Sequence, residues 1–170
     1  MTISATTTNT ALTTTATDGR DLVLTRVIKA PPAKVFAAWT DPALLVKWFA
    51  PRPWTTAQAQ TDVRPGGVQR IVMRGPDGTD VPSHGVYLEV VTDQRLVFTD
   101  AFRRAWEPSD KPFLVVELTF AAHGDQAQQT RYTARVKHWS VADREAHEAM
   151  GFHTGWTVCA EQLAALVEAS

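Results

Sequence analysis

The sequence has few of the features that would direct it toward particular classes of function. Its one cysteine, Cys159, excludes an intrachain disulfide. No apolar run approaches the roughly 18 residues of a membrane-spanning helix, so membrane insertion is not expected. Lys and Arg number 17 against 18 Asp and Glu, and this net charge of -1 gives no electrostatic attraction to nucleic acid. We therefore predict a cytoplasmic protein without nucleic-acid or membrane partners.

Signatures of metal, nucleotide and covalent chemistry are also missing from the sequence. His147-Glu148 begins like the zinc-protease pattern of two histidines four residues apart, but Gly151 stands where the second histidine would be. No serine lies in a Gly-x-Ser-x-Gly turn, and no glycine-rich loop could cradle a phosphate. Cys159 has no base one helical turn away. We predict no metal, no cofactor and no catalytic nucleophile.

The length and composition indicate one domain preceded by a tail. A chain of 170 residues with 44% hydrophobic residues is long enough to bury a substantial core. The first 19 residues are rich in Thr and Ala and offer little apolar area to offset the entropy lost on ordering. We expect residues 1–19 to be a disordered tail and residues 20–170 to be a single domain.

Two short helices are predicted after a first strand in residues 21–30. Apolar residues recur at helical spacing over residues 32–39. Asp41 is a suitable N-cap for a second helix over residues 42–48, and Pro42 suits its first position because a proline lacks only an N–H that would be unpaired there.

Six strand-like runs follow this helical corner, separated by short turns that contain Gly or Asp. The runs are residues 55–63, 68–74, 83–91, 95–102, 113–121 and 128–138. Such short connections favour antiparallel neighbours, so the sequence predicts a sheet of seven strands when the first is included. Residues 103–112, which contain Trp106, are predicted to be a longer loop.

One long helix is predicted over residues 141–169. Six apolar residues fall on one stripe of it at three- and four-residue steps: Ala149, Phe152, Trp156, Ala160, Leu163 and Val167. Gly151 and Gly155 weaken an isolated helix by roughly 1 kcal/mol each, so we expect them to serve close packing or a bend.

Three motifs carry a resemblance to a known family. Asp41-Pro-Ala-Leu-Leu-Val-Lys-Trp-Phe-Ala-Pro51, Arg64-Pro-Gly-Gly67 and Gly155-Trp156 resemble, in order and spacing, the activator of heat-shock protein 90 ATPase homologue-like family. This family belongs to the SRPBCC, START-like or Bet v 1-like superfamily. The resemblance covers residues 21–168 and implies an α+β helix-grip fold. In this fold a curved seven-stranded antiparallel sheet wraps around the long C-terminal helix, two short helices follow the first strand, and a ligand cavity separates sheet and helix.

Ten side chains are candidates for lining that cavity, because they lie on the helix corner, on strand faces or near the helical stripe. They are Trp48, Phe49, Gln69, Ile71, Met73, Phe98, Tyr132, Met150, His153 and Trp156. Gln69 breaks the apolar strand face that it shares with Ile71 and Met73, which suggests a ligand contact. Trp48 and Trp156 are also consistent with filling of the core.

Three functions remain open at this point. The first, which we favour, is non-catalytic binding of a small hydrophobic molecule such as a lipid, a polyketide-like compound or an aromatic metabolite. The second is an aromatase/cyclase-like or hydrolytic enzyme, which would need acid–base groups; Tyr132, His138, His153 and Glu117 are available. The third is a protein-interaction or co-chaperone-like module, and a homodimer is a further possibility. Tyr132 and His153 could instead make only local contacts.

Overall fold

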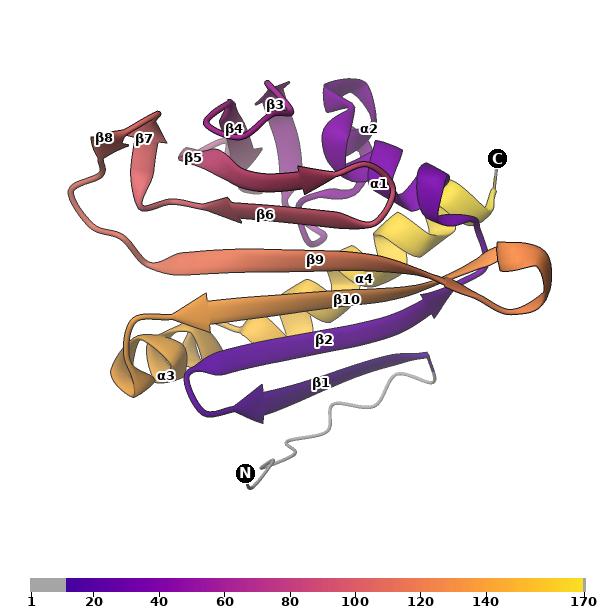
Figure 1. The fold of residues 1–170 in the computed structure, drawn as a ribbon. Helices are drawn as coiled ribbons and strands as arrows, with labels where there is room; N and C mark the ends of the chain where they lie inside the picture. Colours follow the sequence, from indigo (N-terminus) through magenta and orange to yellow (C-terminus); the bar gives the residue numbers. More distant parts are fainter. Residues whose placement is uncertain (1–11, 170) are drawn as a thin grey trace.

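The computed structural model describes residues 12–169, and within this range eight strands form one antiparallel sheet (Figure 1). The order across the sheet is β1-β2-β10-β9-β6-β5-β4-β3. The strands are β1 Thr13–Asp18, β2 Asp21–Ile28, β3 Thr55–Thr61, β4 Val68–Arg74, β5 Asp80–Val91, β6 Arg95–Thr99, β9 Leu114–His123 and β10 Gln129–His138. The α+β helix-grip fold expected from the sequence is confirmed.

The described residues also form four α-helices, and the long C-terminal one lies across one face of the sheet, behind β10 and β2 in Figure 1. They are α1 Pro32–Thr40, α2 Pro42–Trp48, α3 Val141–Ala149 and α4 Phe152–Glu168. Helices α1 and α2 lie near the end of α4, and α3 lies near its beginning (Figure 1). Asp41 caps α2 as predicted, because its Oδ1 accepts a hydrogen bond of 2.9 Å from the N–H of Ala43.

The sheet has one strand more than expected, because the segment predicted to be a disordered tail contributes β1. Residues 1–11 of that segment lie outside the described residues, but Thr13–Asp18 pairs with β2 along its whole length. Thr13, Thr15 and Thr17 point inward and are buried. Threonine is β-branched and suits a strand, and buried hydroxyls find partners here: Thr13 Oγ1 accepts from Arg26 Nη1 at 2.8 Å. Low hydrophobicity was therefore a misleading sign of disorder.

Two further elements differ from the prediction. The expected loop at residues 103–112 contains a small hairpin of β7 Phe102–Arg104 and β8 Glu107–Pro108. The expected single helix over 141–169 is divided at Gly151, which has a φ of 97° in the left-handed region and separates α3 from α4. Glycine adopts this conformation without a steric cost, so the predicted bend at Gly151 is an interruption of the helix.

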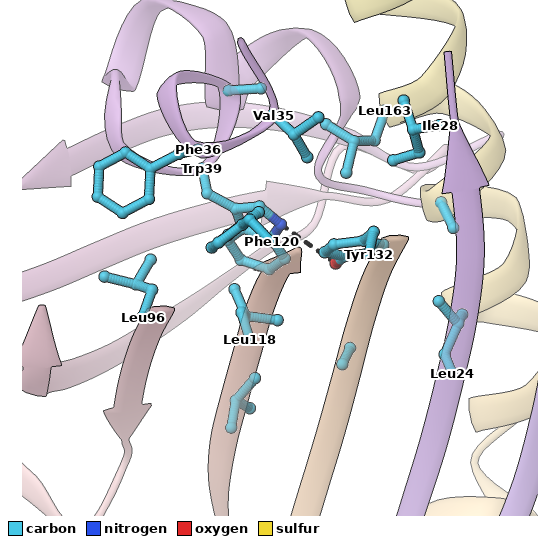
Figure 2. Close-up of a cluster of buried hydrophobic side chains, with 14 of the residues drawn as sticks. Leu24, Ile28, Val35, Phe36, Trp39, Leu96, Leu118, Phe120, Tyr132 and Leu163 are labelled. Atoms are coloured by element: carbon cyan, nitrogen blue, oxygen red, sulfur yellow. Dashed lines mark hydrogen bonds between the residues drawn. The ribbon is translucent and has the colours of Figure 1, made fainter. Parts of the chain in front are cut away.

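The hydrophobic core lies between the sheet, α4 and the α1–α2 corner. Trp39 of α1 is 2% exposed and lies near its centre, facing Tyr132 of β10 (Figure 2). The indole Nε1 of Trp39 donates to the Tyr132 hydroxyl at 3.1 Å, so the buried N–H has a partner. Gln162 connects α4 to the α1–α2 corner, because its Nε2 donates to the carbonyls of Trp48 and Ala50, each at 2.7 Å.

Candidate functional site

A cavity of about 330 Å³ lies between α4, the α1–α2 corner and the sheet. Its wall is mainly aromatic and apolar. The wall residues are Trp39, Trp48, Phe49, Pro51, Met73, Ser83, Tyr132, His147, Met150, Gly151, Phe152, Gly155, Trp156, Cys159 and Ala160. We call this space the main cavity. Met150 is 68% exposed, so the main cavity reaches the surface on this side, where α3 meets α4.

The aromatic part of the wall is held by contacts among its own rings. Trp39 meets Trp48 edge-to-face with ring centroids 4.8 Å apart and Phe49 in the same way at 5.8 Å. Trp48 Nε1 donates to the carbonyl of Ala38 at 2.9 Å, so the polar group of Trp48 has a partner and its contribution to the wall is apolar. On α4, the ring centroids of Phe152 and Trp156 are 5.2 Å apart. These contacts keep a preformed apolar wall in position.

Gly155 marks the place where α4 leaves room for the main cavity. A Cβ atom added at this residue would meet nothing within 4 Å, and the residue belongs to the wall. The close packing that we considered for Gly155 is therefore not present. The absence of a side chain here enlarges the cavity, since any longer residue at this position would project into it.

Two polar side chains of the wall are unsuited to acid–base or covalent chemistry at neutral pH. Burial raises the pKa of the Tyr132 hydroxyl far above its usual range, and this hydroxyl accepts from Trp39. Burial also raises the pKa of the Cys159 thiol to about 12, and its Sγ donates to the carbonyl of Phe49 at 3.0 Å. The thiolate, which is the nucleophilic form, is scarce under these conditions.

His147 is the polar part of the wall near α3, and it is paired with a second histidine, His138. His138 of β10 is 5% exposed, and its Nε2 lies 2.9 Å from Nδ1 of His147. The other ring nitrogen of His138, Nδ1, lies 2.8 Å from the carbonyl oxygen of Arg20. His147 belongs to the wall of the main cavity, whereas His138 does not. Burial lowers the pKa of His147 to about 4, with smaller contributions from the charges of His138 and His153.

A second, smaller cavity of about 160 Å³ adjoins the main one, because Trp39, Phe49 and Trp156 belong to both walls. Three of the predicted site residues, Gln69, Ile71 and Phe98, line this cavity but not the main one. The amide Nε2 of Gln69 donates to the hydroxyl of Tyr87 at 3.4 Å. Gln69 therefore has a protein partner, and its break in the apolar strand face does not by itself require a ligand.

His153, for which the sequence predicted a ligand contact, lines neither of these two cavities. Its Nδ1 lies 2.9 Å from Thr15 Oγ1, and its Nε2 lies 2.8 Å from Glu148 Oε2. The ring therefore links α4 to β1 and α3. The physical reason is the helical rotation of about 100° per residue, which turns His153 toward β1 while its neighbour Phe152 faces the main cavity.

The remaining predicted site residues lie at the main cavity: Trp48, Phe49, Met73, Tyr132, Met150 and Trp156. Sequence reasoning missed Trp39, which was assigned to a helix without a site role. It also missed His147, which had been weighed only as a metal ligand. The pairing of His147 with His138 could not be read from a spacing of nine residues across a strand end and a helix. Between residues 12 and 169, no three His, Cys, Asp or Glu side chains converge on a point where a metal ion could bind.

A wider surface groove of about 760 Å³ lies beside the β7–β8 hairpin, and most of its charged side chains already have partners. Arg103 forms an ion pair with Asp110, and Arg104 forms one with Glu107. The groove therefore offers a ligand little uncompensated charge, and the main cavity is the better candidate site.

Within the described range, no helix is both long and apolar enough to cross a membrane.

Comparisons with known proteins agree with this fold. The profile of the family described as "Activator of Hsp90 ATPase homolog 1-like protein" matches residues 29–168. A solved structure from Nitrosomonas europaea is 36% identical, with a TM-score of 0.82, over 87% of this chain and 94% of that one. A Mycobacterium smegmatis structure is 24% identical with a TM-score of 0.77 over 93% and 98% of the two chains, which shows the shared fold alone. The search of curated proteins found no match.

Proposed function

The chain belongs to the activator of Hsp90 ATPase homolog 1-like family, and on this premise we propose that its main cavity binds a small, largely apolar molecule. The observation that carries the proposal is the preformed space of about 330 Å³ walled by aromatic rings from α1, α2 and α4. Cavities of this kind, mostly apolar with a few polar groups, are typical of small-molecule sites. The lipid, polyketide-like and aromatic compounds named above all fit this description.

The free energy available from apolar burial limits the affinity that a purely apolar ligand can reach in such a site. A ligand that buries about 200 Å² of apolar surface gains roughly 5 kcal/mol at about 25 cal/mol per Å². Association costs at least about 4 kcal/mol in lost translational and rotational freedom. Apolar burial alone therefore supports weak binding, and useful affinity requires that polar groups of the wall also contribute.

Binding without catalysis is supported by the states of the polar side chains. Cys159 and Tyr132 stay protonated at neutral pH, and His153 faces β1. Glu117, which had been considered as an acid–base group, forms ion pairs with Lys137 at 2.7 Å and Arg95 at 2.6 Å. The hydrogen bond from Lys137 is the main reason that the pKa of Glu117 is lowered. An enzymatic role would have to rest on His147 and on His138, which is in contact with it. The cytoplasmic location and the homodimer stay predictions.

Native mass spectrometry of freshly purified protein tests the proposal. We expect a fraction of the protein to carry a bound small molecule, or the stripped protein to bind one equivalent of an apolar compound such as 4-propylphenol. Unchanged apolar compound together with saturable one-to-one binding would support a binding protein. Conversion of the compound would instead favour an enzyme, and the absence of binding to a panel of apolar compounds would contradict the proposal.

A further inference from the structure

His147 is the residue of α3 that reaches the wall of the main cavity. Its ring is packed among Phe113, His138 and Phe152, with ring centroids 5.1 to 5.2 Å away. Of its two nitrogens, Nδ1 is engaged with His138, and no hydrogen bond within the described residues uses Nε2. One ring nitrogen of this wall residue, Nε2, thus has no hydrogen-bond partner among the described residues.

The hydrogen bonds around His138 determine which nitrogen of His147 carries a hydrogen. The carbonyl oxygen of Arg20 can only accept, so His138 Nδ1 must be the donor in their 2.8 Å contact. Neutral His138 then has a bare Nε2, which accepts from His147 Nδ1 at 2.9 Å. In neutral His147 the hydrogen is accordingly on Nδ1, and Nε2 is a lone-pair acceptor.

The neutral form of His147 is the relevant one at physiological pH. Its surroundings are the side chains of Phe113 before β9, His138 on β10, and Phe152 and His153 on α4. Glu148 follows it in the chain, but its carboxylate is taken by Arg144 and His153. Since burial lowers the pKa of His147 to about 4, the ring is uncharged near pH 7.

We propose that Nε2 of His147 accepts a hydrogen bond from the ligand, so that the main cavity selects apolar molecules bearing a hydroxyl or N–H group. His138 is a positioning residue that holds His147 in this tautomer. The inference rests on the proposed function and narrows its ligand class from hydrophobic molecules in general to phenols, alcohols and similar donors. Molecules with only ether or ester oxygens cannot make this bond, because they have no hydrogen to donate.

The test compares 4-propylphenol with its methyl ether, 4-propylanisole, by isothermal titration calorimetry. Because the two compounds also differ in size and hydrophobicity, the informative quantity is the ratio of their Kd values in each protein. We expect this ratio to favour the phenol about three- to tenfold more in the wild type than in His147→Phe, which keeps a ring but removes the acceptor. His123→Phe, a change of the same kind on the end of β9, should leave the wild-type ratio unaltered.

The outcomes separate this inference from the proposed function. If both compounds bind and the ratio is the same in wild type and His147→Phe, the binding function stands and the role of His147 is wrong. If neither compound binds the wild type, both proposals fail for ligands of this size. If His147→Phe weakens the binding of both compounds by the same factor, so that the ratio of their Kd values is unchanged, the inference is also contradicted.

A measurement on the wild type alone covers the case in which His147→Phe does not fold. Long-range ¹⁵N–¹H correlation spectra of histidine-labelled protein distinguish bare from protonated ring nitrogens. We expect Nε2 of His147 to be bare at pH 7 and its signal to move on addition of 4-propylphenol but not of 4-propylanisole. A protonated Nε2, or equal movement with both compounds, would overturn the proposal. In His138→Phe, which removes the acceptor for Nδ1 of His147, we expect His147 to be a mixture of its two neutral tautomers.

Discussion

Replacing Gly155 with Leu should fill the main cavity and stabilise the protein at the same time. Removing a glycine from the interior of α4 gains up to about 1 kcal/mol in helix propensity. A fully buried leucine side chain gains a further 1.5–3 kcal/mol or so, against about 0.5–1 kcal/mol of lost side-chain entropy. Because Gly155 is half-buried, we take the lower part of that range and expect a net gain of about 1–2 kcal/mol.

For a chain of this length, each kcal/mol raises the melting temperature by about 2–4 °C, so Gly155→Leu should melt about 2–8 °C higher. The new side chain would project into the space that a ligand needs, and binding of 4-propylphenol should weaken at least about tenfold. Thermal unfolding followed by circular dichroism measures the first effect, and calorimetric titration measures the second.

Thr154→Leu is the matched control, because it introduces the same side chain into α4 at the exposed neighbouring position. Its affinity for 4-propylphenol should equal that of the wild type. A Gly155→Leu protein that melts lower than the wild type would mean that the open space beside Gly155 is not available to a side chain. A variant that melts higher but binds normally would locate the ligand outside the main cavity.

Four further predictions follow from individual contacts. Deleting residues 1–18 should lower the melting temperature by more than a few degrees, because it removes strand β1; an unchanged midpoint would contradict the docking of this strand. His153→Ala should destabilise the protein by about 1–3 kcal/mol in urea unfolding, because Thr15 loses a buried partner, yet leave ligand affinity unchanged. Cys159, with a thiol pKa of about 12, should react with a disulfide reagent at pH 8 much more slowly in the folded than in the urea-unfolded protein. His147 has a folded pKa of about 4, below its unfolded value of about 6.5, so the unfolded state binds a proton on this ring more tightly than the folded state does. The contribution of His147 to stability, up to about 3 kcal/mol, should therefore be present above pH 6.5 and lost as the pH falls toward 4. His147→Phe should flatten this part of the pH profile of stability measured by urea unfolding.

Local patterns in the sequence were sufficient for most of the framework. Asp41 and Pro42 mark the start of α2 because capping depends on atoms within one helical turn. The stripe through Phe152, Ala160 and Leu163 identifies the buried face of α4 because a helix repeats every 3.6 residues. These signals, together with the resemblance of the three motifs, led to the helix-grip fold and to most of the aromatic wall.

Tertiary structure alone decided the features that depend on distant partners. The threonines of β1 look like a disordered tail in isolation, and they become buried only because β2 and His153 supply hydrogen-bond partners. His147 acquires its role from His138 and from the carbonyl of Arg20, which lies 118 positions before His138 in the chain. The apolar faces could be read from the chain alone, since they follow a local periodicity. Which polar side chain meets which other was decided by packing, since hydrogen bonds between separate elements leave no periodic pattern in the chain.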